Sequence, residues 1–266
     1  MGLVLRHNAA LVVGFALVSV AAPRAYAQHC TAPDAEEPLR EGVTAALAYE
    51  TARFDSDGGY GGWGGIVPEL RASRGGFMAR AWIGGYDIDR PRSHVRGIGD
   101  VGTDLAVHIF ETPRLQAGPL LAMTWPTGDA SAGLGMGHAM VMPAFAAHLT
   151  ADSLRGLATV GYGFGLFVPD DHVHGSGPIV DPMNRSELQS SVGLATILPT
   201  SPGRLAVEGH FAYARPIGIN DGHERGIAGV GLYLSIAAIG VRAATEWPLV
   251  GNPFRVRLQL AASLAL

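Results

Sequence analysis

Charge, cysteine and long apolar runs are all scarce in this sequence. Only 16% of the 266 residues are charged, against about 25% in an average soluble domain. The single cysteine, Cys30, excludes a disulfide-stapled domain and a cysteine-based zinc module. A formal net charge of −4 argues against nucleic acid as a partner, because binding it normally requires a basic patch. The hydrophobic content of 48% in turn excludes a disordered chain.

The first 27 residues have the pattern of a secretory signal peptide. A short basic start at Arg6 is followed by an apolar stretch over 11–22, and an Ala-Tyr-Ala sequence ending at Ala27 supplies the small residues of a cleavage site. The apolar stretch is too short for a membrane-spanning helix. We therefore expect cleavage after Ala27, export across the inner membrane, a flexible periplasmic lead-in over 28–41 and one domain over 42–266.

The rest of the chain alternates apolar and polar residues with a period of two, which predicts β-strands. In the clearest example, Arg255, Arg257 and Gln259 alternate with a row of apolar residues: Phe254, Val256, Leu258, Leu260, Ala262, Leu264 and Leu266. Such segments are about ten residues long, which is the length of a tilted strand that crosses a bilayer. Twelve are predicted, near 42–54, 66–72, 76–87, 98–111, 117–126, 138–149, 154–168, 186–198, 203–214, 226–236, 238–247 and 253–266. The segment at 66–72 contains Pro68, and its two faces cannot be told apart by pattern.

An even number of such segments predicts an all-β fold, a transmembrane antiparallel β-barrel of about 12 strands in the bacterial outer membrane. The connections support this prediction because long and short ones alternate. The long ones, expected outside the cell, are 55–65, 88–97, 127–137, 169–185, 215–225 and 248–252. The short ones, expected in the periplasm, are 73–75, 112–116, 150–153, 199–202 and 237. A lipocalin-type soluble barrel also alternates, but its outward face would normally bring more charge than this chain has.

Aromatic side chains usually form girdles at both membrane interfaces of such a barrel. Ten residues are candidates for these girdles: Tyr49, Trp63, Trp82, Tyr86, Trp125, Tyr162, Phe167, Tyr213, Tyr233 and Trp247.

Glycine turn motifs between residues 97 and 135 give a family resemblance. They are Gly97-Ile98-Gly99-Asp100, Trp125-Pro126-Thr127-Gly128-Asp129 and Gly133-Leu134-Gly135. Proline cannot donate to a strand ladder, so Pro126 should end a strand, and the glycines should let the backbone bend at a barrel rim. The motifs resemble the MetA-pathway phenol-degradation family of outer-membrane transporters. The resemblance implies an outer-membrane barrel that passes small, often hydrophobic, molecules, and it supplies no catalytic residues.

If the apolar faces of the strands meet lipid, the opposite faces point into the lumen. The residues predicted to line it are Glu50, Arg80, Asp104, His108, His148, Arg204, Glu208, His210, Arg242, Glu246, Arg255 and Arg257, together with Gln259. Because the first and last strands of a closed barrel are neighbours, Glu50 could face Arg255 or Arg257. One interpretation is a charge-paired ladder that stabilises a narrow interior. The other is a constriction that selects small polar or anionic solutes. Twelve strands enclose less space than a 16-stranded porin, so the pore should be narrow or plugged by a loop.

Histidines in the predicted outer connections suggest an alternative function. The candidate metal ligands are His138, Asp170, Asp171, His172 and His174. Imidazole nitrogen suits copper or zinc, so a metal-binding or metal-uptake barrel is a second hypothesis, and a sealed structural barrel is a third. The spacing of these residues matches no named metal motif, and they can equally be ordinary polar residues of solvent-exposed loops.

Enzymatic activity is not expected. His148 and Thr150 lie two residues apart, as the His and Ser of outer-membrane phospholipase A do, but the second residue here is a threonine and not a serine. The sequence contains no nucleophile-elbow, P-loop or metalloprotease motif. The expected partners are membrane lipid and a small solute, with no cofactor unless the metal hypothesis holds.

Overall fold

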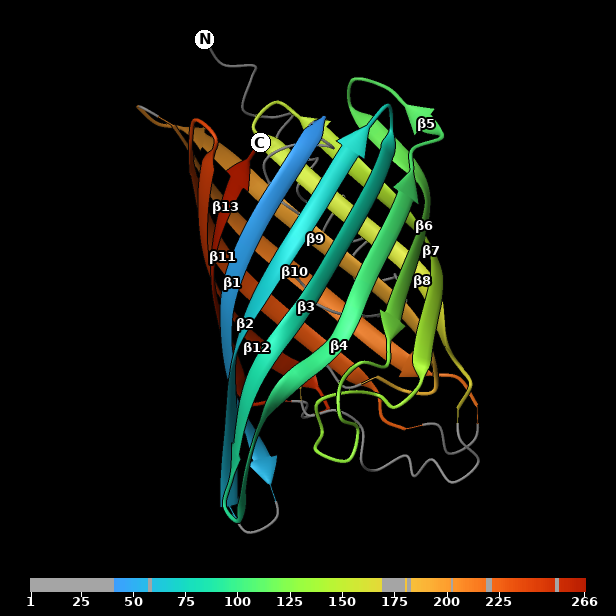
Figure 1. Ribbon diagram of the computed structural model, residues 1–266. Helices are drawn as coiled ribbons and strands as arrows, with labels where there is room; N and C mark the ends of the chain where they lie inside the picture. The colour runs from blue at the N-terminus through green and yellow to red at the C-terminus, as the bar shows by residue number, and fades with distance from the viewer. Residues whose placement is uncertain are drawn as a thin grey trace.

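The computed structural model describes residues 41–56, 59–168, 180, 183–201, 203–218, 222–251 and 254–266 (Figure 1). The strands are β1 (Gly42–Ser56), β2 (Gly59–Arg74), β3 (Phe77–Arg90), β4 (Ser93–Val107), β5 (Phe110–Glu111), β6 (Leu115–Trp125), β7 (Ala139–Ala151), β8 (Leu154–Leu166), β9 (Ser186–Pro199), β10 (Arg204–Pro216), β11 (Arg225–Ile236), β12 (Ile239–Val250) and β13 (Val256–Ala265). In the part of the chain that the structure describes, no helix is long and apolar enough to cross a membrane.

The strands form one closed antiparallel barrel. Each long strand pairs with its neighbour along the chain, and β1 pairs with β13, so that Glu50 lies opposite Gln259. The pairing of β4 with β6 completes the ring, because the two-residue β5 only extends the pairing of β6 beyond the end of β4. The twelve long strands confirm the predicted all-β barrel of about 12 strands.

Side chains alternate between the outer and inner faces of the barrel. On β13, Leu258 and Leu260 are at least half exposed on the outer face, whereas Arg257 and Gln259 are buried inside. Each of the twelve long strands contributes at least one exposed large hydrophobic residue to the outer surface. The outside of the barrel is therefore apolar all the way round, and its charged residues concentrate in the interior and at the two ends.

The two ends of the barrel differ in their connections. At one end, which we call the short-turn end, tight turns join β2 to β3, β7 to β8 and β11 to β12 (Figure 1). Gly75 and Gly76 form the first of these turns with φ of 56° and 76°, the left-handed conformation that two-residue hairpins favour. The opposite end, the long-loop end, carries the connections 126–138, 167–185 and 217–224. The C-terminus and the beginning of β1 lie at the short-turn end.

Two predicted long connections are wrong. Residues 55–65 and 88–97 are mostly strand, because β1 and β2 extend to Ser56 and from Gly59, and a two-residue turn separates β3 from β4. Figure 1 shows these hairpins projecting beyond the rest of the barrel. The glycines in β2 serve packing rather than a loop. A Cβ on Gly65 would lie 2.5 Å from Cε1 of Tyr86, so only glycine leaves room for that ring.

The predicted segment at 66–72 is the central part of the longer strand β2, and its faces are now clear. Trp63, Val67 and Glu69 point into the barrel, whereas Ile66 and Leu70 are exposed on the outside. Pro68 also lies on the outer face, where the pairing of β2 with β3 is interrupted between Ile66 and Glu69. A proline has no N–H to donate, so a gap in the ladder at this position is expected.

Candidate functional site in the barrel interior

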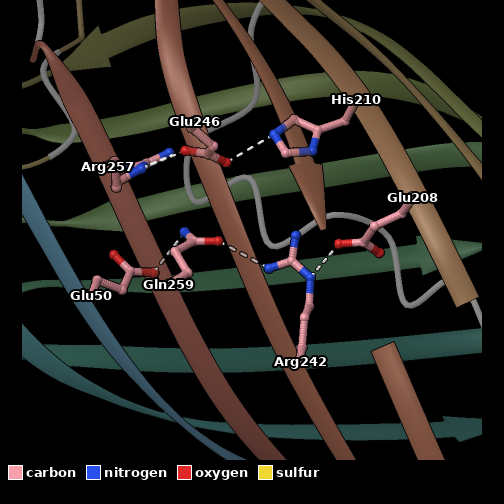
Figure 2. A network of polar contacts seen from close by, with 7 residues as sticks. All are labelled: Glu50, Glu208, His210, Arg242, Glu246, Arg257 and Gln259. Atoms are coloured by element: carbon pink, nitrogen blue, oxygen red, sulfur yellow. Dashed lines mark hydrogen bonds and ion pairs between the residues drawn. The ribbon is translucent and has the colours of Figure 1, made fainter. Parts of the chain in front are cut away.

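A chain of hydrogen-bonded charges crosses one wall of the barrel interior (Figure 2). Nε of Arg257 on β13 donates to Oε2 of Glu246 on β12 at 2.5 Å, and the other carboxylate oxygen of Glu246 lies 2.8 Å from Nε2 of His210 on β10. All three side chains are buried. A buried carboxylate is stable only when it is paired and hydrogen-bonded, and both oxygens of Glu246 have partners here.

The contact between His210 and Glu246 depends on a glycine. Strand β11 lies between β10 and β12, and its residue in register with both side chains is Gly229. A Cβ at this position would lie 2.5 Å from Nε2 of His210 and 2.8 Å from Cγ of Glu246. Because glycine has no side chain, the two residues meet directly above β11.

A second chain of contacts runs parallel to the first and joins four side chains (Figure 2). Nε2 of Gln259 donates to Oε1 of Glu50 at 3.0 Å, and the amide oxygen of Gln259 accepts from Nη1 of Arg242 at 2.9 Å. Nε of Arg242 donates to Oε1 of Glu208 at 2.5 Å. Gly231 of β11 leaves space for this last contact, as Gly229 does for the first chain, because a Cβ would lie 3.0 Å from Cγ of Glu208.

The opposite wall carries a smaller ion-pair cluster around Arg80. Its guanidinium lies 2.8 Å from Glu69 and 3.3 Å from Asp104, and it stacks over the ring of Trp82 at 4.6 Å. The sequence pattern identified Arg80 and Asp104. It missed Glu69 because the faces of the segment around Pro68 could not be assigned.

A third cluster, near the long-loop end, was not predicted. Oε2 of Glu187 accepts from the backbone N–H and the side-chain amide of Asn184 and from Nη2 of Arg225, at 3.0, 2.6 and 2.6 Å. Asn184 in turn exchanges hydrogen bonds with the backbone of His223. Glu187 and Arg225 stand at strand ends, where period-two alternation gives little signal. The signal that could have revealed this inward face is the row of polar residues at every second position of β9, namely Glu187, Gln189 and Ser191.

A cavity of about 220 Å³ lies between the two walls. It extends from Glu50 and Trp82 toward the short-turn end of the barrel, where His108 and His148 line it. Seven of the residues predicted to line the lumen lie around this cavity: Glu50, Arg80, Asp104, His108, His148, His210 and Arg242. Apolar side chains complete the lining, including those of Met78, Met123 and Met142. Burial lowers the pKa of the His108 imidazole, which favours its neutral form.

Two of the predicted lumen residues lie at the ends of the barrel instead of its buried interior. Arg204 is exposed at the start of β10, at the short-turn end. Arg255 is exposed at the long-loop end, where it contacts Asp55 at 2.9 Å and stacks over Tyr60 at 4.2 Å. The remaining predicted residues, Glu208, Glu246, Arg257 and Gln259, are buried in the two contact chains.

Apolar side chains fill the interior toward the long-loop end. This apolar cluster includes Phe54, Trp63, Trp82, Tyr86, Ile88, Leu134, Val180, Ile227 and Phe254. The rings of Trp63 and Tyr86 meet edge to face, with centroids 5.7 Å apart. Phe254 belongs to this cluster because it precedes β13, so its predicted place on the outer face of that strand is wrong.

The burial of several aromatic side chains corrects the predicted aromatic girdles. Five of the ten candidates are buried: Trp63, Trp82, Tyr86, Tyr213 and Tyr233. The other five are exposed: Tyr49, Trp125, Tyr162, Phe167 and Trp247. Alternation does not distinguish a large aromatic that fills a narrow barrel from one that faces outward, because both suit a strand.

The glycine motifs fasten a loop over the long-loop end. Asp100 lies next to a β-bulge, where the register between β3 and β4 shifts. Its Oδ1 accepts from the N–H of Gly128 at 2.9 Å, and its Oδ2 accepts from the N–H of Met136 at 2.7 Å. The loop 126–138 thereby carries Leu134 into the apolar cluster. A Cβ on Gly97 would lie 2.6 Å from Cδ1 of Leu134, so this glycine leaves room for that side chain.

Of the predicted metal ligands, only His138 lies within the described residues, and it is buried rather than exposed in an outer loop. Asp170, Asp171, His172 and His174 lie outside the described residues. Within the described ranges, no group of three or more His, Cys, Asp or Glu side chains is placed to hold a metal ion. Metal binding by the outer loop stays a prediction.

Comparison with known proteins connects this fold to outer-membrane barrels. No protein-family profile matches the sequence, and no curated protein matches it. Among solved structures, the COG4313 outer membrane channel from Pseudomonas putida F1 superposes with a TM-score of 0.59 at 15% identity, over 88% of this chain and 99% of that one. The NanC porin gives 0.53 at 11% identity, over 84% of this chain and all of the porin.

The β domain of the Bordetella autotransporter Brka gives a TM-score of 0.52 at 12% identity, over 85% of this chain and all of that domain. At these identities the likeness concerns the fold. The chain therefore has the architecture of a closed antiparallel barrel that outer-membrane channels, porins and autotransporter domains share.

Proposed function

We propose that this protein is a bacterial outer-membrane barrel through which small solutes, hydrophobic or anionic, pass by diffusion. The observation that carries the proposal is the distribution of polarity. The outer face is apolar around the whole ring, whereas the interior holds paired charges and a cavity. A surface of this kind suits lipid, and closure of the ring satisfies the backbone groups that lipid cannot. The predicted signal peptide over 1–27, the motif resemblance and the likeness to channels support the same function.

The interior suggests that passage is gated at the long-loop end. The cavity extends toward the short-turn end, which we assign to the periplasm because periplasmic turns are short in such barrels. On the other side the apolar cluster and Leu134 occupy the interior. A solute that crosses the barrel must displace some of these side chains. Leu134, on the loop 126–138, lies outside the strands, as do Val180 and Phe254 of the cluster.

The cavity lining gives the solute class. Met78, Trp82, Met123 and Met142 offer apolar contacts, and Arg80 and Arg242 lie on opposite walls. Both arginines are bonded to carboxylates, so their attraction for an anion is reduced but not abolished. Such a lining suits a small molecule that has an apolar body and at most a single negative charge.

A sealed structural barrel is the second candidate. The observation that favours it is the filling of the interior, since the two contact chains and the apolar cluster together occupy much of it. Conductance decides between the two functions. The mature chain, residues 28–266, is refolded into a planar bilayer and compared with Leu134→Ala, which removes a side chain from the cluster.

The control is Leu234→Ala, which removes an equal number of atoms from the outer face of β11, where Leu234 is exposed. We expect brief openings of the unmodified chain, openings that last severalfold longer in Leu134→Ala, and no change in Leu234→Ala. Absence of current from both the unmodified chain and Leu134→Ala would overturn the proposal in favour of the sealed barrel.

A further inference from the structure

Two histidines face each other where the cavity reaches the short-turn end. His108 lies in the connection between β4 and β5, and its backbone N–H donates to the carbonyl oxygen of Gly76 at 2.8 Å. His148 projects inward from β7, directly opposite Gln116 of β6. The two imidazole rings have centroids 5.4 Å apart and planes inclined by 54°.

This separation matches two imidazoles that share one metal ion. A zinc ion lies about 2 Å from a ligating nitrogen, hence about 3 Å from the ring centre, so two ligands at a tetrahedral angle have ring centres about 5 Å apart. The ring planes are inclined by 54°, so the two imidazoles are not stacked face to face.

The polar atoms around the pair are short of partners. Nδ1 of His108 and Oε1 of Gln116 are both buried and, within the described part of the chain, neither has a hydrogen-bond partner. The amide nitrogen of Gln116 is engaged, because it donates to Glu111 at 3.0 Å. Buried polar atoms without partners are rare and often mark the place of a water or an ion. The two imidazoles line this end of the cavity, and Gln116 lies on the neighbouring strand directly opposite His148.

We infer that His108 and His148 form a binding site for a divalent transition-metal ion of the zinc class at the short-turn mouth of the barrel. The amide oxygen of Gln116 and water complete the coordination. Imidazole with oxygen ligands suits Zn²⁺, Ni²⁺ or Cu²⁺. Only two of the ligands are histidines, so the ion exchanges with solution and does not act as a permanent structural centre. In the sequence, the predicted loop ligands His172 and His174 fall between β8 and β9, and the facing ends of these two strands lie at the other end of the barrel.

Metal binding here does not depend on solute passage, so it is measured on the folded barrel in detergent. The background protein is the mature chain with Cys30→Ser, His172→Ala and His174→Ala. These substitutions remove the cysteine thiol and the two histidines of the predicted outer-loop site. Zn²⁺ is titrated by calorimetry, and Co²⁺ is titrated by its visible absorption, which reports the coordination geometry. We expect one ion per chain and an intense tetrahedral Co²⁺ band.

His108→Gln and His148→Gln should each weaken binding by roughly tenfold or more, since loss of even a supporting group has an effect of that size. His94→Gln is the matched control, because His94 is exposed on β4 near the turn that joins it to β3, at the other end of the barrel. Folding of each variant is checked by the gel shift of the unheated barrel. His108 stands outside the long strands, so His108→Gln keeps the test available if His148→Gln fails to fold.

Unchanged Zn²⁺ affinity in a folded His108→Gln variant would overturn the inference. If the unmodified chain binds Zn²⁺ and the background protein does not, the inference is overturned, because the metal is then held by Cys30 or by His172 and His174. A second measurement adds Zn²⁺ to one side of a planar bilayer at a time. If the barrel conducts, we expect block from the side of the short turns only. Absence of conductance would count against the proposed function and leave the calorimetric result standing.

Discussion

His210 on β10 and Glu246 on β12 are bonded at 2.8 Å although strand β11 lies between them. Side chains on adjacent strands are usual partners. Side chains on strands separated by a third strand meet only where no side chain projects from that third strand. Gly229 provides that opening, and Gly231 does the same for Glu208 and Arg242. The glycines of β11 thus allow charges from β10, β12 and β13 to form continuous chains of contacts.

Gly229→Ala should destabilise the barrel. The added methyl group would lie 2.8 Å from Cγ of Glu246 and closer still to His210, so the contact between these two residues has to open. Overpacking of this kind costs roughly 1–3 kcal/mol. The measurement is urea-induced unfolding in lipid vesicles, followed by tryptophan fluorescence.

The matched control for this prediction is Gly209→Ala on β10. A Cβ there would meet only the carbonyl oxygen of Gly229, at an ordinary 3.8 Å, so we expect a change within about 0.5 kcal/mol. Equal stabilities of Gly229→Ala and Gly209→Ala would show that the bridge over β11 contributes nothing.

Loss of one partner of the Arg257–Glu246 ion pair should lower the free energy of unfolding by more than half of what the loss of both partners costs. The two side chains are almost completely buried and 2.5 Å apart. Loss of one partner leaves a buried charge uncompensated, at a cost of about 3–5 kcal/mol. We expect Arg257→Gln and Glu246→Gln to couple by at least about 1 kcal/mol in a double-mutant cycle of unfolding free energies. Strict additivity would argue that His210 or water replaces the missing partner.

The barrel and most of its inward charges follow from alternation alone. On β13, Arg257 and Gln259 lie on one face and Leu258 and Leu260 on the other. Because side chains alternate with a period of two, the polar pair must point inward once the apolar pair faces outward. The same pattern could not supply Glu69, because Pro68 and the flanking glycines remove the contrast between the faces of β2. It also could not show which charges pair, since partners such as His210 and Glu246 are set by a glycine on a third strand.

The predictions for the glycine-rich stretches 55–65 and 88–97 are wrong for a related reason. Residues 55–65 and 88–97 contain Gly, Asp and Ser, with Pro91 in the second stretch, and these residue types predict loops. In the barrel, Gly61 and Gly65 lie on the inner face of β2 beneath the rings of Phe54 and Tyr86. A narrow interior needs small residues next to large ones, and a single sequence does not distinguish that need from a turn.

Protonation of Asp129 should have a measurable midpoint below the ordinary 3.8. The hydroxyl of Ser131 donates to Oδ1 of Asp129 at 2.6 Å, and the N–H groups of Ser131 and Ala132 donate to the same oxygen. These hydrogen bonds lower the pKa of Asp129. Its contribution to loop order is therefore complete above pH 3.8 and is lost as the pH falls through the lower folded value. The backbone amide shifts of Ser131 and Ala132 should report this midpoint by NMR, and Asp129→Asn should abolish the titration. A midpoint above 3.8 would contradict the bonded arrangement.

Asp100→Ala should release the loop 126–138 without unfolding the barrel. The carboxylate of Asp100 accepts one hydrogen bond from each arm of the loop, from Gly128 and from Met136. Its removal leaves the strand pairing intact but frees both arms, so Leu134 should leave the apolar cluster for part of the time. We expect faster amide exchange over 127–137, measured by mass spectrometry, and longer channel openings. Gly135→Ala should act in the same direction, because its Cβ would lie 3.0 Å from Cγ of Asp100.

Asp89→Ala is the control for this release, since Asp89 is an exposed carboxylate at the same end of the barrel, on β3. It removes an equal charge near the same mouth, so any purely electrostatic effect on conductance should be common to both variants. Faster exchange in Asp100→Ala alone would identify the carboxylate as the fastening of the loop. If exchange quickens without longer openings, the strand residues of the apolar cluster, Trp63 and Tyr86 among them, close the barrel by themselves.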